Sequence, residues 1–463
     1  MRDFTPAATA IGVLVVAAVS SAPADDHIFK IESWTIDTAE QWQRAAADTQ
    51  AMTLEAGQAK PTADQAHFQS RLRRFADKRK LNRITFTQTA SWPQWQPVDG
   101  IAPKNTRNAP VFLPVKENEY WYFAERGGRY HAFHTSDMKN WTHHGEVAPS
   151  KWVTTAEYAD GKVYIYYDKP NDQDPHLVVH EDLTDTNQRS NKGEVFADPS
   201  HGSDAGILRS SDGIFHLIYE DWTPIDARRH SWDSPLAGHA DSEDGVHGFE
   251  PHEQTAPIDE RTVPQPDFGR YDHSSRDHGL FYHKHKPEQD AYGDFTLVQI
   301  GQRYYIFCDY DPHNGPMGIG YWSSDDINGR FDWQGTIDRG FHPDPTIGFA
   351  NGRFYLLVQR NDQDYVSQGP WVETVRVRAG VDTDGDDKVD QWTDWQTVRE
   401  TYHRKEGFAR VVETDPAAID LSNLPAARGV RFEFKVNAPD QSDDGAGEAN
   451  PKPTMDQVRI EFQ

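Results

Sequence analysis

The stretch Ser203–Asp221, SDAGILRSSDGIFHLIYED, decides the fold of this chain. It predicts a β-hairpin, because apolar Ile207 and Leu208 precede a turn at Ser211-Asp212-Gly213 and an apolar run ending in Tyr219 follows it. Four other stretches resemble it: APVFLPVKENEYWYF from Ala109, WVTTAEYADGKVYIYY from Trp152, DFTLVQIGQRYYIFCDYD from Asp294 and DPTIGFANGRFYLLVQR from Asp344. Five copies of one hairpin indicate a repeat architecture.

The segments after the hairpins extend the repeat. Each of the first four hairpins is followed by a candidate outer strand, whereas the fifth is not. The stretch ITFTQTASWPQWQPV, Ile84–Val98, resembles those outer strands but precedes the first hairpin. An N-terminal strand that completes the last sheet leaves a ring of sheets without a free edge. We therefore predict a mainly β protein with a five-bladed β-propeller over residues 84–371, in which 84–98 close the last blade.

The N-terminus has the features of an export signal. Arg2 precedes an apolar run, Ala7–Ala18, that is too short to span a bilayer, and Ala22-Pro23-Ala24 fits a cleavage site. Residues 1–24 are thus predicted to be a signal peptide, and an uncleaved anchor is the alternative. The mature protein is expected to be secreted or periplasmic and to have no membrane association.

Residues 25–83 are predicted to be helical. Thr38 and Gln41 resemble a capping box, and the residues that follow up to Gly57 are rich in helix formers. A second periodic stretch would place Phe68 and Leu72 on one face of a helix. The pattern predicts an N-terminal helical hairpin packed on the propeller.

Residues 372–463 are predicted to form a C-terminal β-sandwich with an acidic loop, DTDGDDKVD, at Asp382–Asp390. Carboxylates at positions 1, 3, 5 and 9 of this loop could surround a hard cation, so we predict structural Ca²⁺ there. The predicted ligands are Asp382, Asp384, Asp386 and Asp390. A metal-free acidic turn is the alternative, since Asp387 stands where the usual calcium loop has Gly. No organic cofactor is expected.

The composition of the chain narrows the classes of partner that it can bind. The net charge of −26 argues against a nucleic-acid partner, because phosphate binding needs clustered Lys and Arg. Aromatic residues make up 12% of a hydrophilic chain, which favours aromatic platforms of the kind that sugar sites use. Cys308 is the single cysteine, so an intramolecular disulfide is excluded. Composition leaves the oligomeric state open.

The starts of the inner strands are the predicted site, because in a propeller they converge at one end of the central channel. The residues so placed are Asn108, Trp152, Asp204, Asp294 and Asp344, with His201 and His342 beside them. Carboxylates that share one pocket raise the pKa of at least one of them. A protonated acid beside an ionised one is what glycosidic bond cleavage needs. Glu220, which ends the third hairpin, is expected to lie at the outer end, with a place in the site as the alternative.

The repeat resembles the five-bladed propeller glycoside hydrolases of family 43 and the related family 117, whose members act on agar. The second, third and fourth hairpins carry the likeness. It implies that Asp204 orients the general acid and that Asp294 is that acid, although family 43 normally has Glu there. It also implies inverting hydrolysis. The family's general base is an Asp in the first blade, where this chain has Asn108. Either another group, such as Asp344 or Glu157, serves as the base, or the mechanism differs, or the propeller binds sugar without cleaving it.

A long aperiodic loop between Phe249 and Asp294 is rich in His and Arg. Loops of this length in compact domains are usually functional. Arg270 and His273 are therefore predicted to bind substrate, such as an anionic marine sugar. The leading hypothesis is an exported glycoside hydrolase acting on a polysaccharide or oligosaccharide. A non-catalytic carbohydrate-binding protein and a polysaccharide lyase are the alternatives.

Overall fold

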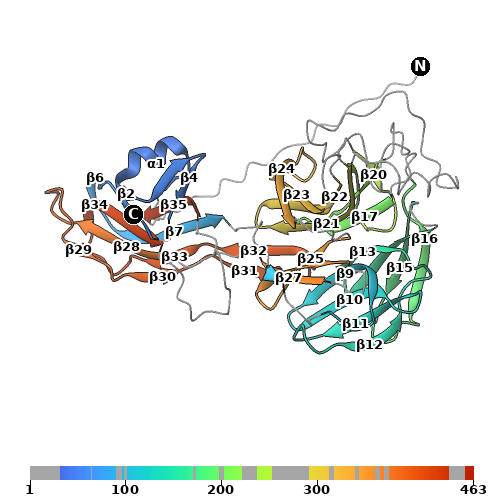
Figure 1. The fold of residues 1–463 in the computed structure, drawn as a ribbon. Helices are drawn as coiled ribbons and strands as arrows, with labels where there is room; N and C mark the ends of the chain where they lie inside the picture. The colour runs from blue at the N-terminus through green and yellow to red at the C-terminus, as the bar shows by residue number, and fades with distance from the viewer. Residues whose placement is uncertain are drawn as a thin grey trace, which may run out of the picture.

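The computed structural model describes residues 32–63, 65–89, 96–97, 102–169, 174–197, 203–221, 237–252, 291–311, 318–338, 344–359, 365–369, 375–436 and 454–463. Within these residues the protein is mainly β-structure, as predicted, with one helix, α1 (Ala39–Ala45). The strands form two units that lie side by side in Figure 1: a five-sheet unit from the middle of the chain and a terminal unit from both its ends. In the described part of the chain, no helix is long and apolar enough to cross a membrane.

The five-sheet unit contains five antiparallel sheets, each begun by one of the predicted hairpins. In chain order the strands of the first three sheets are β9 (Arg107–Lys116), β10 (Glu119–Glu125), β11 (Tyr130–Thr135) and β12 (Thr142–Glu146); β13 (Val153–Ala159), β14 (Lys162–Asp168), β15 (Pro175–His180) and β16 (Arg189–Glu194); and β17 (Ser203–Arg209), β18 (Phe215–Glu220), β19 (Ala237–Ser242) and β20 (Glu250–Pro251). Those of the last two are β21 (Ala291–Ile300), β22 (Arg303–Asp311), β23 (Gly318–Ser324) and β24 (Asp332–Asp338); and β25 (Thr346–Ala350), β26 (Arg353–Val358), β27 (Tyr365–Gly369) and, from earlier in the chain, β8 (Gln96–Pro97).

The sheets pack against one another in a cycle. Five hydrophobic clusters each join two neighbouring sheets, and one of them joins the fifth sheet to the first through Tyr355 and Phe112. The first strands, β9, β13, β17, β21 and β25, contact one another in the same order. Threonine hydroxyls bridge these strands, as where Thr346 Oγ1 accepts the N–H of Phe112 at 3.2 Å. The first strands therefore line the centre of the unit.

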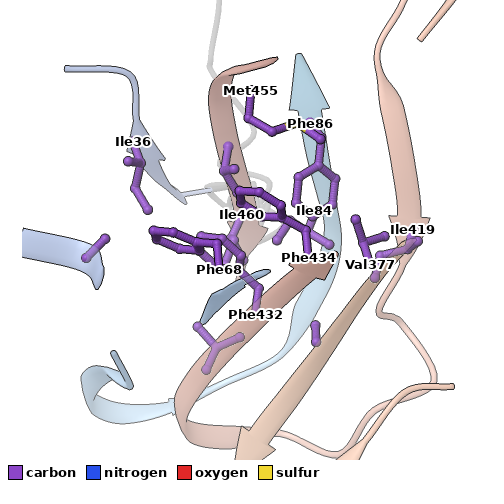
Figure 2. Close-up of a cluster of buried hydrophobic side chains, with 14 of the residues drawn as sticks. Ile36, Phe68, Ile84, Phe86, Val377, Ile419, Phe432, Phe434, Met455 and Ile460 are labelled. Atoms are coloured by element: carbon purple, nitrogen blue, oxygen red, sulfur yellow. The ribbon is translucent and has the colours of Figure 1, made fainter. Parts of the chain in front are cut away.

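The terminal unit consists of two sheets that bury one hydrophobic cluster between them (Figure 2). One sheet contains β3 (Met52–Glu55), β4 (Gln58–Pro61), β35 (Thr454–Phe462), β7 (Leu81–Thr89) and β33 (Ala417–Asp420), with β1 (Glu32–Ile36) paired to β35. The other contains β2 (Ala46–Gln50), β5 (Ala66–Ser70), β34 (Ala427–Val436), β28 (Val375–Asp382) and β29 (Gln391–Trp392), with β30 (Gln396–Val398) on β28 and β6 (Arg73–Arg79) on β34. Alternation places Phe68, Phe432 and Phe434 in the core.

The predicted N-terminal helical hairpin is wrong. The capping box at Thr38 and Gln41 is present, but α1 ends at Ala45, and the predicted second helix is replaced by β5 and β6. The reason is a partner distant in sequence: β5 pairs with β34, so Phe68 stacks on Phe434 with ring centroids 5.0 Å apart. Helix propensity is a weak preference that such packing overrides.

The predicted closing segment, residues 84–98, belongs to two different sheets. Only β8 pairs with β27 in the fifth sheet. Ile84 lies in β7, where it pairs with Ile460 and Ile419 of the terminal unit. The alternating apolar residues that suggested an outer strand do form a strand, but Ile84 and Phe86 point into the core of the terminal unit.

An arm, defined as residues 401–415, connects the two units. It contains β31 (Thr401–Arg404) and β32 (Val411–Asp415), which are antiparallel to each other. β32 runs parallel to β21, pairing Val411 with Gln299 and Val412 with Ile300. The arm thus adds two strands to the fourth sheet at the end of β21 (Figure 1).

Candidate active site

Four residues at corresponding places in four sheets share an unusual backbone conformation. Asn108, Asp204, Asp294 and Asp344 have φ angles of 67°, 46°, 49° and 58°. This left-handed region is uncommon for residues other than Gly, and Asn and Asp tolerate it best. Strand pairing is also shifted around Asp204 and Asp294, as in a β-bulge that re-aims a side chain. Strain repeated at the same place in four sheets indicates a functional site.

Three carboxylates form an acid cluster, which comprises Asp294, Asp309 and Asp344. One oxygen of each lies within 4.8 Å of the others. The carboxyl groups of Asp294 and Asp344 are hydrogen bonded to each other. Asp309 is buried, and its Oδ1 accepts the backbone N–H of Asp344 at 2.8 Å.

The surroundings of the cluster favour its protonated form. Burial raises the pKa of Asp344 to about 6, and the hydrogen bond to Asp294 offsets part of that rise. Tyr130 is fully buried, and burial together with the charges of Asp344 and Asp294 holds its pKa well above the usual value. Its hydroxyl donates to Ala109 O at 2.7 Å. A neutral phenol therefore lies beside a carboxyl pair in which the pKa of Asp344 is raised.

Asn108 lies at the same end of the first strands. Its Nδ2 donates to Tyr130 Oη at 3.5 Å and to Lys151 O at 3.4 Å. Trp152, the next residue, is half-buried, and Lys151 Nζ lies 4.2 Å from the centroid of its ring. The first sheet therefore brings the Asn108 amide beside Tyr130, whereas a role for the Trp152 indole stays a prediction.

Asp204 is partly exposed, and its N–H binds Asp168 Oδ2 at 3.3 Å. It does not belong to the acid cluster as the described residues define it. Glu157 is fully buried, and its carboxylate accepts the N–H groups of Tyr158 and Arg209, so water has no access to it. The remaining predicted ligands of a sugar fall outside the described residues: His201, His342, Arg270 and His273.

A set of acids near the ends of the second strands was not predicted from the sequence to belong to the site. Asp168 and Asp309 each accept the N–H of the left-handed residue in the following sheet. Glu220 pairs with Ser203, so it lies beside Asp204 and not at the outer end, as had been expected. The signal was available: the second strands read YWYFAE, YIYYD, HLIYE and YIFCD. An antiparallel hairpin brings the end of its second strand beside the start of its first.

The acidic loop between β28 and β29 gathers three of its four predicted ligands. Oxygens of Asp382, Asp384 and Asp390 lie within 4.8 Å of one another. Asp386 instead accepts from Lys388 Nζ at 3.1 Å. Asp382 is buried and accepts the N–H of Gly385 at 2.6 Å.

No protein-family model matches the sequence, and no curated protein matches it. Among solved structures the chain is similar to family-43 glycoside hydrolases, the resemblance already carried by its repeat. They include an α-L-arabinofuranosidase from Clostridium thermocellum (13% identity, 67% of this chain and 95% of that chain, TM-score 0.39). A family-43 enzyme from Xanthomonas citri with bound xylotriose has 15% identity over 58% and 88% of the two chains, at a TM-score of 0.41. An exo-β-1,3-galactanase from Phanerochaete chrysosporium has 9% identity over 82% and 100%, at 0.41.

Proposed function

We propose that this protein is a glycoside hydrolase that cleaves a polysaccharide or oligosaccharide at the acid cluster. The observation that carries the proposal is the hydrogen-bonded pair of Asp294 and Asp344 at the converging starts of the first strands, in which burial raises the pKa of Asp344 to about 6. A carboxylic acid with a raised pKa can protonate a leaving glycosidic oxygen near neutral pH.

The geometry suggests a division of roles. Carboxyl groups that flank a scissile glycosidic bond are about 5–10 Å apart, whereas Asp294 and Asp344 bond to each other. They therefore act together as one general acid, with Asp294 as the donor that the family resemblance implies. We assign the general base to Asp204, the partly exposed carboxylate at the corresponding position of the third sheet.

The five sheets are, in this proposal, the blades of a five-bladed β-propeller. Cyclic packing of the clusters between sheets and of the first strands supports it. The pairing of β8 with β27, which covers the outer edge of the last sheet, also supports it. Inverting stereochemistry, an anionic marine substrate and export stay predictions from the sequence.

The test is hydrolysis of algal and plant polysaccharides by the purified protein, followed as new reducing ends. Asp294→Asn is expected to lower kcat by about 10²–10⁴-fold, because the amide cannot donate the proton, while the melting temperature stays close to that of the wild type. Asp325→Asn, which removes an exposed carboxylate, is the matched control. Near-normal turnover by Asp294→Asn, or no release of sugar by the wild type from any polysaccharide, contradicts the proposal.

A carbohydrate-binding protein without hydrolysis is the second candidate. Asn108 favours it, because its amide is committed to Tyr130 and Lys151 and cannot accept a proton from water. Under this alternative the migration of the wild type is slowed in a gel that contains the polysaccharide, but the protein releases no reducing ends from it. A lyase is separated from both by the absorbance of an unsaturated uronate product.

A structural Ca²⁺ in the acidic loop of the terminal unit is a separate proposal. The clustering of Asp382, Asp384 and Asp390 supports it, since carboxylate oxygens are the ligands that calcium prefers. Because the loop lies in the terminal unit, we propose that this ion stabilises the fold and takes no part in hydrolysis.

A further inference from the structure

Arg410 lies between the two strands of the arm, and its side chain is buried in the centre of the five-sheet unit. It is 2% exposed. Its neighbours in the arm, Ala409 and Val412, belong to hydrophobic clusters of the five-sheet unit. An arginine is rarely buried so completely unless its donors are satisfied.

The guanidinium of Arg410 bonds to the first strands of four different sheets. Its Nη1 donates to Ile347 O at 2.9 Å and to Thr296 Oγ1 at 3.3 Å. Its Nη2 donates to Phe112 O and Ala156 O, and its Nε to Ala156 O, each at 3.3 Å. The planar fork of donors thus holds β9, β13, β21 and β25 at one point, which a lysine could not do.

The charge of Arg410 is offset by a buried acid. Glu157 lies in β13, directly after the carbonyl that Arg410 binds, and it interacts electrostatically with Arg410. Glu157 also accepts two backbone N–H groups and is fully buried. A buried charge is tolerated when it is paired and hydrogen bonded, as both groups are here.

The arm that carries Arg410 is held at both ends of its path. At its root, Gln88 and Glu400 accept each other's backbone N–H at 2.8–2.9 Å. At its tip, Phe408 lies 4.8 Å below the guanidinium of Arg209 in the third sheet. The arm pairs with the end of β21, whereas Asp294 is near its start. Arg410 therefore reaches the centre from the end opposite the acid cluster.

We propose that Arg410 is a positioning residue, a cation supplied by the arm that fixes the first strands so that Asp294 and Asp344 meet. Thr296 is two residues from Asp294, and Ile347 is three residues from Asp344, so the bonds of Arg410 act on the backbone that carries both acids. The kinetic part of this inference rests on the proposed function.

The test compares Arg410→Met with Arg404→Met. Arg404 is in the same arm, but its guanidinium bonds to the arm's own carbonyls, those of Lys405 and Phe408. R410M is expected to lower kcat roughly 10–100-fold with little change in KM, since small displacements of reacting groups have effects of this size. The basic limb of the kcat–pH profile of R410M should move to lower pH, because water that reaches the loosened pair of Asp294 and Asp344 favours its ionisation. R404M should leave kcat and the pH profile unchanged. A folded R410M with wild-type kcat and pH profile overturns the proposal.

A readout without turnover separates this inference from the proposed function. Carbon-13 NMR of the aspartate carboxyl groups, assigned with Asp344→Asn, follows the titration of Asp344 in each variant. We expect it to move to lower pH in R410M and not in R404M. If the wild type hydrolyses nothing but this shift is seen, the proposed function fails and the role of Arg410 stands. An unchanged titration in R410M contradicts that role.

Should R410M fail to fold, free guanidinium replaces the side chain. Arg410→Ala vacates a site lined by carbonyl oxygens, so guanidinium chloride below denaturing concentration is expected to raise its melting temperature. Sodium chloride at equal ionic strength is the control, and the wild type should show no such gain. Equal effects of the two salts on R410A overturn the proposal.

Discussion

At the scale of single residues, the site depends on backbone strain. Asn108, Asp204, Asp294 and Asp344 each adopt a left-handed φ, and each such residue costs on the order of 1–3 kcal/mol. The acids that end the second strands compensate part of this, because Asp168 and Asp309 bind the strained residues' own N–H groups. Positions that accept strain in this way favour function over stability.

Asp344 should make the stability of the protein depend on pH. Its pKa is raised in the folded protein to about 6 from an ordinary 3.8, so between these values the folded state binds more protons than the unfolded state. The free energy of unfolding must then fall as pH rises from about 4 to 6. We expect Asp344→Asn to remove a loss of about 1–2 kcal/mol over this range, measured by urea unfolding at several pH values.

A second buried acid, Glu400, also makes stability depend on pH, so the wild type must be compared with Asp344→Asn. Burial raises its pKa to about 7, so the wild type also loses stability through Glu400 as pH rises. The difference between wild type and D344N cancels this contribution. Parallel pH profiles for the two proteins would show that Asp344 has no raised pKa.

At the scale of elements, local pattern predicted the hairpins and the C-terminal strands but failed for the N-terminal segment. In each hairpin, such as the one with its turn at Ser211-Asp212-Gly213, the two paired strands lie within about 20 residues of each other. Alternation and turn residues are therefore enough to recognise the hairpin. β5 and β7 instead pair with β34 and β35, more than 350 residues away. Nothing local distinguishes β5 from a helix rich in Ala, Gln and Arg, and the alternation of β7 identifies it as a strand but not the sheet to which it belongs.

The same reason limited the prediction of the site. The order of the hairpins brought Asp294 and Asp344 to equivalent places in their sheets, because repeats put their first strands in equivalent places. Asp309 was overlooked because its role appears only when the end of β22 is set beside the start of β25. Arg410 comes from outside the repeat, so no pattern within the hairpins could indicate it.

Substitution of Trp42 tests the β-structure found in place of the predicted N-terminal helical hairpin. It is fully buried, packs edge-on against Phe68 and donates through Nε1 to Gly57 O at 2.9 Å. Trp42→Ala is expected to lower the free energy of unfolding by about 3–5 kcal/mol, measured by chemical denaturation. Trp395→Ala, at a half-buried tryptophan of the same unit, is the control and should cost much less. Equal losses in the two variants would contradict this packing.

The acidic loop allows a sharp test of calcium binding. Asp384→Asn removes a member of the carboxylate group, whereas Asp386→Asn removes one that binds Lys388. Chelation by EGTA is expected to lower the melting temperature of the wild type and of D386N, but not that of D384N, measured by calorimetry. The sequence alone assigned both residues to the ion, so their different behaviour tests the structure directly. No effect of EGTA on the wild type would show that the loop holds no stabilising calcium.

At the scale of the whole molecule, both ends of the chain build one unit. β7 lies between β35 and β33, so removal of residues 1–89 leaves the C-terminal strands with exposed edges and an open core. We expect the truncated protein to aggregate or to lose protection from hydrogen exchange in residues 375–436, measured by size-exclusion chromatography and mass spectrometry. A monomeric truncated protein with full protection would show that the C-terminal strands fold on their own.

The pairing of β7 with β35 also sets the order in which a newly made chain can fold. Synthesis must add 365 residues after Thr89 before Thr454 exists, which takes roughly 20–70 s at ordinary translation rates. During that interval β7 lacks β35, and until residue 410 is made the five sheets also lack the guanidinium of Arg410 at their centre. A ribosome product that stops between these two points holds Arg410 but not the last strand. The terminal unit is therefore the part of the molecule that can be completed only when synthesis has passed all five sheets.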